Sequence, residues 1–192
     1  MKYEKNLLET LGKLRVFPIG DDMNLQMINN MREMVFSKIE EDKRKPIYLL
    51  VDSDGGNTDA GFIGYDFLKS IHVPLVAIIN GYCKSSAIPL IAGCRYRHSF
   101  PHSNFFFHSP TTGKKHKISA TFSFKEAYKV DEAEVERFKT DYQTICKREF
   151  GMSKEELDEL WSRGDLYGEE ISPQKAREIG IIHKIITKFP FY

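Results

Sequence analysis

The sequence predicts an α/β protein in which helices pack around a parallel β-sheet. Two short apolar runs, at 47–51 and 73–79, contain no charged residue, as is typical of strands that are buried on both faces. Longer segments on either side of these runs carry apolar residues at every third or fourth position, which is the spacing of one helix face. Strands that alternate with helices in this way indicate layers of helices around a sheet.

The elements are expected to follow one another as strand–helix units. Gly20 stops the first strand, and Ile28, Met31 and Val35 give the first helix an apolar face. Gly180 ends the last helix. The predicted strands are 14–20, 47–51, 73–79, 104–108 and 181–186. The predicted helices are 22–41, 58–71, one that opens at the serines 85–86, and then 124–149, 153–162 and 173–179.

Length and composition predict one globular domain that spans residues 1–192. The net charge of +1 gives no field that would attract a nucleic acid or an acidic membrane surface. Residues 1–14 are charged throughout and lack the apolar core of a secretory signal, and no apolar run is long enough to cross a bilayer. The three cysteines have no metal-ligand spacing and fit a reducing compartment. We therefore expect a cytoplasmic protein that binds neither nucleic acid nor a membrane.

Three polar features fall at the carboxyl ends of predicted strands. DSDGG (52–56) follows strand 47–51, NGYCKSS (80–86) follows strand 73–79, and His108 is the last residue of strand 104–108. In open α/β sheets, reacting groups and ligands gather at the carboxyl ends of the strands. We therefore expect the two turns and His108 to lie close together.

Ser85 or Ser86 is the candidate nucleophile. A serine attacks a carbonyl group efficiently only when a base removes its proton and fixed donors stabilise the oxyanion. The first N–H groups of a helix are unpaired, and Gly55 and Gly56 lack side chains, so the two turns can supply an oxyanion hole together. Each turn by itself is equally typical of an ordinary helix cap or glycine turn.

His108 is the candidate base, because its ring would emerge at the strand end beside both turns. An acid should hold the imidazole in one tautomer, and Asp165, in a loop shortly before the last helix, is the first choice. Asp158 is the second choice, since its place inside a regular helix favours a surface charge.

Other reactive residues are less consistent with a site. Lys84 precedes Ser85 directly, and neighbours on a helix face different directions, so Lys84 is not expected to act as the base. His98 and His102 have the spacing of helical metal ligands, but Pro101 lies between them, and no metal site is predicted. Cys83 is expected to be a small buried side chain.

Four segments resemble motifs of the Clp protease proteolytic subunit family, which has the ClpP/crotonase fold. IYLLVDSDGG resembles the family's apolar strand ending in Asn-Ser-Pro-Gly-Gly, and NGYCKSSA resembles its Gly-x-Ala-Ala-Ser-Met-Gly turn. FPHSNFFFHSP resembles the stretch that carries the family's histidine, and SPQKAREIGII resembles its C-terminal segment. The resemblance runs from about Arg15 to Ile186.

The resemblance implies layered parallel sheets and a protruding handle helix, formed here by the segment that begins at Phe124. It also implies a serine endopeptidase in which Ser85 is the nucleophile, His108 the base and Asp165, to within one residue, the acid. The N–H groups of Gly56 and Ser86 would form the oxyanion hole. The family further implies that subunits assemble into stacked heptameric rings, a tetradecamer, with the sites inside a chamber. No cofactor is expected.

Several residues depart from the family's motifs. Asp54 replaces a proline, Lys84 replaces an alanine beside the nucleophile, and Ser86 replaces a methionine. Pro89 falls inside the helix after the serines and is expected to bend it or shorten its start. The N-terminus lacks most of the segment that forms the family's axial loops, and Leu50 replaces a surface tyrosine. An AAA+ ATPase unfoldase is therefore an open expectation as a partner.

The function that these residues favour is hydrolysis of peptide bonds in peptides or unfolded proteins. The motif departures leave a second interpretation, a catalytically silent ring subunit with a structural or regulatory role. An acyl-CoA enzyme of the crotonase type is less consistent, because the chain is short for that group and no glutamate is evident at the strand ends. A Ser-Lys peptidase is weaker still, because no lysine other than Lys84 lies near a motif.

Overall fold

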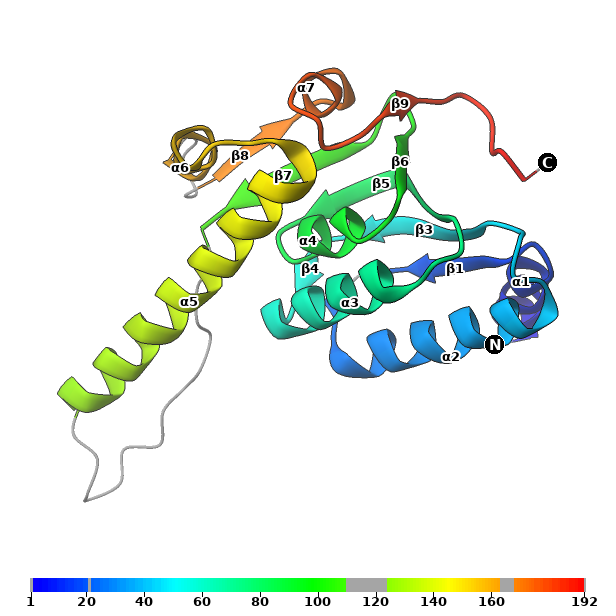
Figure 1. Cartoon of the computed structure of the whole chain (residues 1–192), viewed down its shortest axis with the longest axis horizontal. Helices are drawn as coiled ribbons and strands as arrows, with labels where there is room; N and C mark the ends of the chain where they lie inside the picture. Colours follow the sequence, from blue (N-terminus) through cyan, green and yellow to red (C-terminus); the bar gives the residue numbers. More distant parts are fainter. Residues whose placement is uncertain (1, 21, 110–123, 163–167, 192) are drawn as a thin grey trace.

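The structure, a computed structural model, describes residues 2–20, 22–109, 124–162 and 168–191, with the side chains of residues 2–5 and 124–131 left out. A seven-stranded sheet forms its centre, in the order β1-β3-β5-β6-β9, with β7 beside β5 and β8 beside β7 (Figure 1). Every pairing in this sheet is parallel except that of β7 with β8. The predicted α/β fold with a parallel sheet is therefore confirmed.

The strands and helices are bounded as follows. The sheet contains β1 (Val16–Ile19), β3 (Ile47–Ser53), β5 (Leu75–Lys84), β6 (Tyr96–Ser99), β7 (Asn104–His108), β8 (Gly168–Ile171) and β9 (Lys184–Ile185). A separate parallel pair consists of β2 (Asp22–Met23) and β4 (Gly55–Gly56). The helices are α1 (Lys2–Lys13), α2 (Leu25–Glu41), α3 (Thr58–Ser70), α4 (Ala87–Ala92), α5 (Phe124–Phe150), α6 (Lys154–Ser162) and α7 (Pro173–Glu178).

Strand β5 is long enough to pair with two strands in succession. Its first part, Val76–Ile79, pairs with β6, and its last part, Tyr82–Lys84, pairs with β7. Strands β3, β5 and β7 run parallel, so their carboxyl ends reach the same edge of the sheet. Helix α5 projects away from the body of the protein, as the handle expected from the resemblance would (Figure 1).

Several helix and strand boundaries differ from the expected ones. The first long helix begins at Leu25 rather than residue 22, because the side chain of Asn24 accepts a hydrogen bond from the Met27 N–H and caps the helix. The last strand contains only Lys184–Ile185 of the expected 181–186. Helix α4 begins at Ala87 despite Pro89, since Pro89 lies in the first turn, where a helix N–H has no intrahelical partner. Elements α1, β2, β4, β6 and β8 were not expected.

Burial follows the expected faces with one exception. Ile28, Met31 and Val35 of α2 are fully buried, and residues 75–79 of β5 are buried on both faces. In β3, however, Ile47, Leu49 and Val51 are buried, whereas Tyr48 and Leu50 are only half-buried. The prediction that this strand is buried on both faces is therefore wrong. Its second face is covered partly by the C-terminal segment, where Phe191 contacts the Tyr48 ring.

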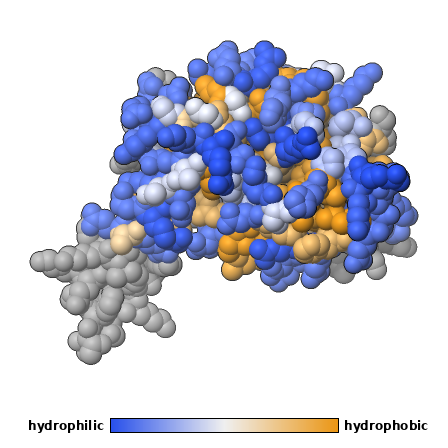
Figure 2. Space-filling view, in the orientation of Figure 1, coloured by the Kyte–Doolittle hydropathy of each residue, from blue (hydrophilic) through white to orange (hydrophobic). Residues whose placement is uncertain are grey.

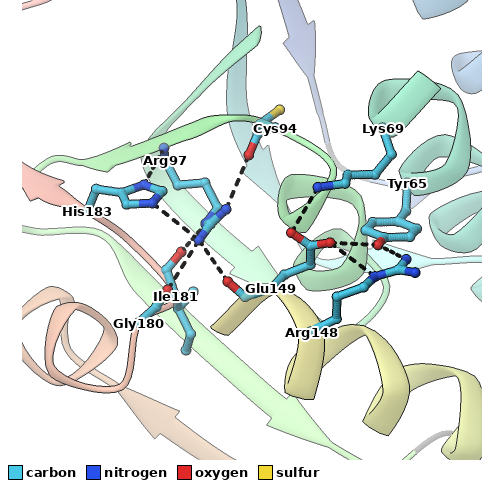
Figure 3. A network of polar contacts seen from close by, with 9 residues as sticks. All are labelled: Tyr65, Lys69, Cys94, Arg97, Arg148, Glu149, Gly180, Ile181 and His183. Carbon is cyan, nitrogen blue, oxygen red and sulfur yellow. Dashed lines mark hydrogen bonds and ion pairs between the residues drawn. The ribbon is translucent and has the colours of Figure 1, made fainter. Parts of the chain in front are cut away.

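A buried arginine joins three parts of the chain near the edge of the sheet that is opposite β1. Arg97 is 4% exposed, and its guanidinium group donates to main-chain carbonyl groups (Figure 3). The acceptors are the carbonyl oxygens of Cys94, Glu149, Gly180 and Ile181. The main-chain N–H of Arg97 also donates to Nδ1 of His183 over 3.0 Å. Arg97 thus links β6 to the end of α5 and to the segment before β9.

None of the helices in the described part of the chain carries an apolar stretch long enough to span a membrane.

Candidate active site

Ser85 lies at a sharp turn between a strand and a helix. Strand β5 ends at Lys84, and α4 begins at Ala87 with Ser86 as its N-cap residue. The φ angle of Ser85 is +52°, a left-handed conformation that is uncommon for a residue with a side chain. The Ser85 N–H donates to the Phe106 carbonyl of β7 over 3.0 Å, and this bond holds the turn against the neighbouring strand. Backbone outliers of this kind are frequent at functional sites.

His108, the last residue of β7, is in hydrogen-bonding contact with Ser85. The distance from His108 Nε2 to Ser85 Oγ is 2.7 Å, and that from His108 Nδ1 to the Ser109 carbonyl oxygen is 2.8 Å. A carbonyl oxygen only accepts, so the proton of the neutral ring lies on Nδ1, and Nε2 is free to accept from the serine hydroxyl. The ring also stacks on Phe106, with centroids 5.6 Å apart. The structure therefore brings together the predicted nucleophile and base.

The glycine turn packs directly against the serine turn. Gly55 and Gly56 have φ angles of +92° and +142°, which residues with side chains rarely adopt. A Cβ atom at Gly55 would lie 2.7 Å from the Lys84 carbonyl oxygen and 2.7 Å from Ser85 Cβ. A Cβ atom at Gly56 would lie 2.4 Å from Asp22 Oδ1. Only glycine fits at either position, and its absence of a side chain allows the two turns to touch.

The predicted residues share a pocket of about 250 Å³. It is lined by Asp54, Gly56, Thr58, Ser85, Ser86, His108 and Tyr142. Ser86 is 2% exposed, and its hydroxyl lies 3.8 Å from the sulfur of Met23, away from His108. Of the two candidate serines, Ser85 is therefore the one whose hydroxyl meets the base. A larger pocket of about 440 Å³ lies beside Arg97 and His183, and the lining residues of that pocket include neither Ser85 nor His108.

Tyr142 is a residue of the site that the sequence did not indicate. Its hydroxyl donates to the carbonyl oxygen of Ser85 over 3.3 Å, and its ring makes edge contacts with Phe107 and Trp161. Burial raises the pKa of Tyr142 well above its ordinary value, so the hydroxyl remains a donor at every working pH. In the sequence, Tyr142 is one of the regularly spaced apolar positions of the predicted helix 124–149. A tyrosine on the inner face of a helix is the signal that could have identified it, since a buried hydroxyl requires a partner.

The acid of the predicted triad is not described. Asp165 lies outside the described residues. Asp158, the second choice, is exposed on α6, and its carboxylate accepts a hydrogen bond from the side chain of Gln143 over 3.1 Å. In the described part of the chain, the group facing His108 Nδ1 is the Ser109 carbonyl.

The other reactive residues considered from the sequence, Lys84 and Cys83, make different contacts from those of a catalytic group. Lys84 is the last residue of a strand, and the expectation that it lies on a helix beside Ser85 is wrong; its ammonium group forms an ion pair with Asp54 over 2.8 Å. Cys83 is fully buried, and burial raises the pKa of its thiol far above the ordinary value, which makes it unreactive. Among the residues that the structure describes, no group of three or more His, Cys, Asp or Glu side chains is arranged to hold a metal ion.

Comparison with known proteins points to the same family that the sequence motifs resemble. The family model "Clp protease" matches residues 2–189. The ATP-dependent Clp protease proteolytic subunit 2 of Prochlorococcus marinus (strain NATL2A) is 28% identical over 179 residues, which cover 92% of this chain and 84% of that protein. The ATP-dependent Clp protease proteolytic subunit of Mesostigma viride is 26% identical and covers 92% of this chain and 73% of its own length.

A solved structure shows the same fold. A ClpP1 mutant from Listeria monocytogenes superposes with a TM-score of 0.78 over 96% of this chain and 98% of its own, at 18% sequence identity. The resemblance and the layered fold that the sequence motifs predicted are thereby confirmed.

Proposed function

Because the chain belongs to the Clp protease family, we propose that it is a serine endopeptidase that hydrolyses peptide bonds. The observation that carries this proposal is the 2.7 Å contact between Ser85 Oγ and His108 Nε2. This is the hydrogen bond through which a histidine can remove the proton of an attacking serine. The pocket around the contact is large enough to admit a peptide carbonyl group.

In the proposed reaction, His108 Nε2 takes the hydroxyl proton as Ser85 Oγ attacks the carbonyl carbon of the substrate. The negative charge that develops on the carbonyl oxygen would be bound by the N–H groups of Gly56 and Ser86. His108 then gives the proton to the leaving amine, and water hydrolyses the acyl-enzyme by the same route in reverse. Asp165 is the proposed third member of the triad, whose carboxylate would accept the hydrogen bond from Nδ1–H in place of the Ser109 carbonyl and stabilise the imidazolium.

We extend the proposal to the assembly. Stacked heptameric rings would enclose the sites in a chamber and restrict the substrates to peptides and unfolded proteins. The long α5 helix, which projects from the body, suits the handle between rings. Apolar side chains are exposed on α1 and α2, namely Leu7, Leu8, Leu25 and Phe36, and Figure 2 shows apolar areas interrupting an otherwise hydrophilic surface. Exposed apolar groups of this kind favour contacts with other protein surfaces.

The proposal includes a class of partner and a cellular location. The relatives are named as subunits of ATP-dependent proteases, and an AAA+ unfoldase is the class of partner that this name implies for the chain. Cys83, Cys94 and Cys146 are all free and buried, which is consistent with a reducing compartment such as the cytoplasm.

A fluorophosphonate probe tests the proposed activity, since it reacts covalently with an activated serine. The intact oligomer should be labelled, and the Ser85→Ala variant should not. Ser86→Ala is the matched control: its hydroxyl faces Met23, and its proposed contribution is a main-chain N–H that alanine retains. Labelling that persists in Ser85→Ala would exclude this serine as the nucleophile.

A second function, a catalytically silent ring subunit, is favoured by one specific observation. A charged pair, Asp54 and Lys84, stands beside the nucleophile where the family's motifs have proline and alanine. An intact, correctly folded oligomer that the probe does not label at any pH between 6 and 9 would support the silent subunit instead.

A further inference from the structure

An ion pair connects the two turns that form the pocket. Lys84 Nζ lies 2.8 Å from Asp54 Oδ1, and the two side chains are 23% and 69% exposed. Lys84 directly precedes Ser85, and Asp54 directly precedes Gly55 and Gly56. Each partner is thus attached to the start of one turn. Asp54 itself lines the pocket together with Ser85 and His108.

The pair lies where the backbone ladder between the two strands ends. The pairing of β3 with β5 is regular up to Val51, is interrupted by a bulge, and includes Ser53 opposite Cys83 as its last pair. In the bulge, the carboxylate of Asp52 accepts from the Tyr82 N–H over 2.8 Å. Asp54 directly follows the last residue of β3, and Lys84 is the last residue of β5. Their side chains therefore continue the cross-link beyond the last backbone pair.

Lys84 is held from a second side as well. Its ammonium group lies 3.8 Å from the centroid of the Tyr82 ring, which is within the range of a cation–π interaction. A lysine that is fixed both by an aromatic face and by a carboxylate loses little further freedom when it forms the ion pair. This arrangement makes the pair a more effective link than a free surface lysine would be.

We propose that the Asp54–Lys84 ion pair is a positioning device, which holds the glycine turn and the serine turn at the separation that peptide hydrolysis requires. The inference rests on the proposed function, because it assigns a role in the same site. The positive φ angle of Ser85 leaves the serine turn dependent on outside contacts, and Gly55 and Gly56 give the glycine turn a backbone with more conformational freedom. A displacement of about 1 Å between reacting groups can cost on the order of 100-fold in rate, so a weak link at this position has a measurable effect.

Variants that neutralise one partner test the role. Lys84→Met and Asp54→Asn should each lower kcat and the rate of fluorophosphonate labelling by about two- to fivefold, the range expected for a partly exposed pair, with KM nearly unchanged. The exchanged variant, Asp54→Lys with Lys84→Asp, should recover most of the loss. In 1 M NaCl, where the Debye length is about 3 Å, the difference between wild type and the neutral variants should shrink.

Lys175→Met is the control. Lys175 and Glu178 form an exposed ion pair of 3.7 Å on α7, away from the pocket and from the helices proposed to make ring contacts. Its loss should change neither kcat nor the labelling rate. Oligomer size and thermal midpoint are measured for every variant, so that a loss of folding or assembly is separated from a loss of positioning.

The outcomes distinguish this inference from the proposed function. A wild-type protein that is not labelled at all refutes both. A labelled wild type with neutral variants of equal rate refutes the positioning role alone. A change in KM that depends on the charge of the peptide, with kcat unchanged, also overturns it, since that result would make the pair a substrate contact.

Discussion

The hydroxyl group of Tyr142 on α5 donates to the main-chain carbonyl of Ser85. Ser85 has a left-handed backbone, and its carbonyl has two donors, the Tyr142 hydroxyl at 3.3 Å and the Ile88 N–H at 3.1 Å. The Ser85 N–H in turn donates to the Phe106 carbonyl, so both main-chain polar groups of Ser85 are held by hydrogen bonds. The long helix therefore supports the turn that carries the candidate nucleophile.

Replacing Tyr142 with phenylalanine should weaken this support. The ring contacts with Phe107 and Trp161 would remain, whereas one buried hydrogen bond is lost, which should lower the free energy of unfolding by about 1 kcal/mol. Fluorophosphonate labelling should slow several-fold as Ser85 gains freedom. Tyr65→Phe, which removes a hydroxyl bonded to Glu149 instead, should affect stability without slowing the labelling. Equal labelling rates in both variants would show that Tyr142 has no role in positioning Ser85.

Gly55→Ala should disrupt the contact between the two turns. The new methyl group would overlap the Lys84 carbonyl and Ser85 Cβ, and alanine rarely adopts the φ angle of +92°. We expect a destabilisation of about 1–3 kcal/mol from the backbone alone. Labelling of Ser85 should fall on the order of 100-fold, because the oxyanion donors move relative to the nucleophile.

Gly20→Ala provides the comparison, since nothing lies within 4 Å of a Cβ atom there and its φ angle is outside the left-handed range. Urea unfolding and labelling rates should both stay close to wild type in this control. If Gly55→Ala behaved in the same way as Gly20→Ala, the close packing of the two turns would be irrelevant to the site.

Much of the site could be predicted because parallel strands end together. The apolar runs identified β3, β5 and β7, and strand 104–108 was predicted with its observed bounds. The carboxyl ends of the three strands then had to converge, which led to the expectation that Ser85 and His108 lie close together. No knowledge of register was needed for this step, because each residue lies at the end of its own strand.

Other features depend on register or on single side chains and could not be predicted. Strand β8, GEEI, contains two glutamates and pairs antiparallel with β7, so no apolar run marks it. The pairing of Asp54 with Lys84 depends on an irregularity between β3 and β5, in which β5 advances from Ile79 to Cys83 while β3 advances only from Val51 to Ser53, and the sequence does not reveal this shift. The Tyr142 hydroxyl reaches Ser85 because α5 packs against α4, the helix that follows the serine turn, and no sequence pattern marks this packing.

Arg97→Lys should destabilise the protein strongly. The guanidinium group donates in several directions to carbonyl groups from three segments (Figure 3), and a lysine ammonium at the end of a flexible chain cannot reach all of them. Carbonyl groups left without a donor should reduce the free energy of unfolding by about 3 kcal/mol. Urea unfolding measures this value. Arg95→Lys, an exposed neighbour, should lie within about 0.5 kcal/mol of wild type, as surface substitutions usually do.

Protonation of His183 should destabilise the same region. Partial burial and the positive charge of Arg97 lower the pKa of His183, and its Nδ1 must stay unprotonated to accept the Arg97 N–H. In the unfolded chain, the imidazole takes up a proton as the pH falls through about 6.5. The unfolded state then binds more protons than the native state, so stability should decrease as the pH falls from 7.5 to 5.5. This window lies above the range in which carboxylates titrate.

The His183→Asn variant isolates this contribution. An asparagine side-chain oxygen can accept the Arg97 N–H but does not titrate, so the variant should lose less stability between pH 7.5 and pH 5.5 than the wild type does. Some dependence should remain in the variant, because burial and the charge of Lys184 also lower the pKa of His98. Urea midpoints at the two pH values provide the measurement, with His102→Asn on the exposed turn before β7 as a control that keeps the wild-type difference. If the His183→Asn variant lost as much stability between pH 7.5 and pH 5.5 as the wild type, a group other than His183 would be responsible for the acid sensitivity.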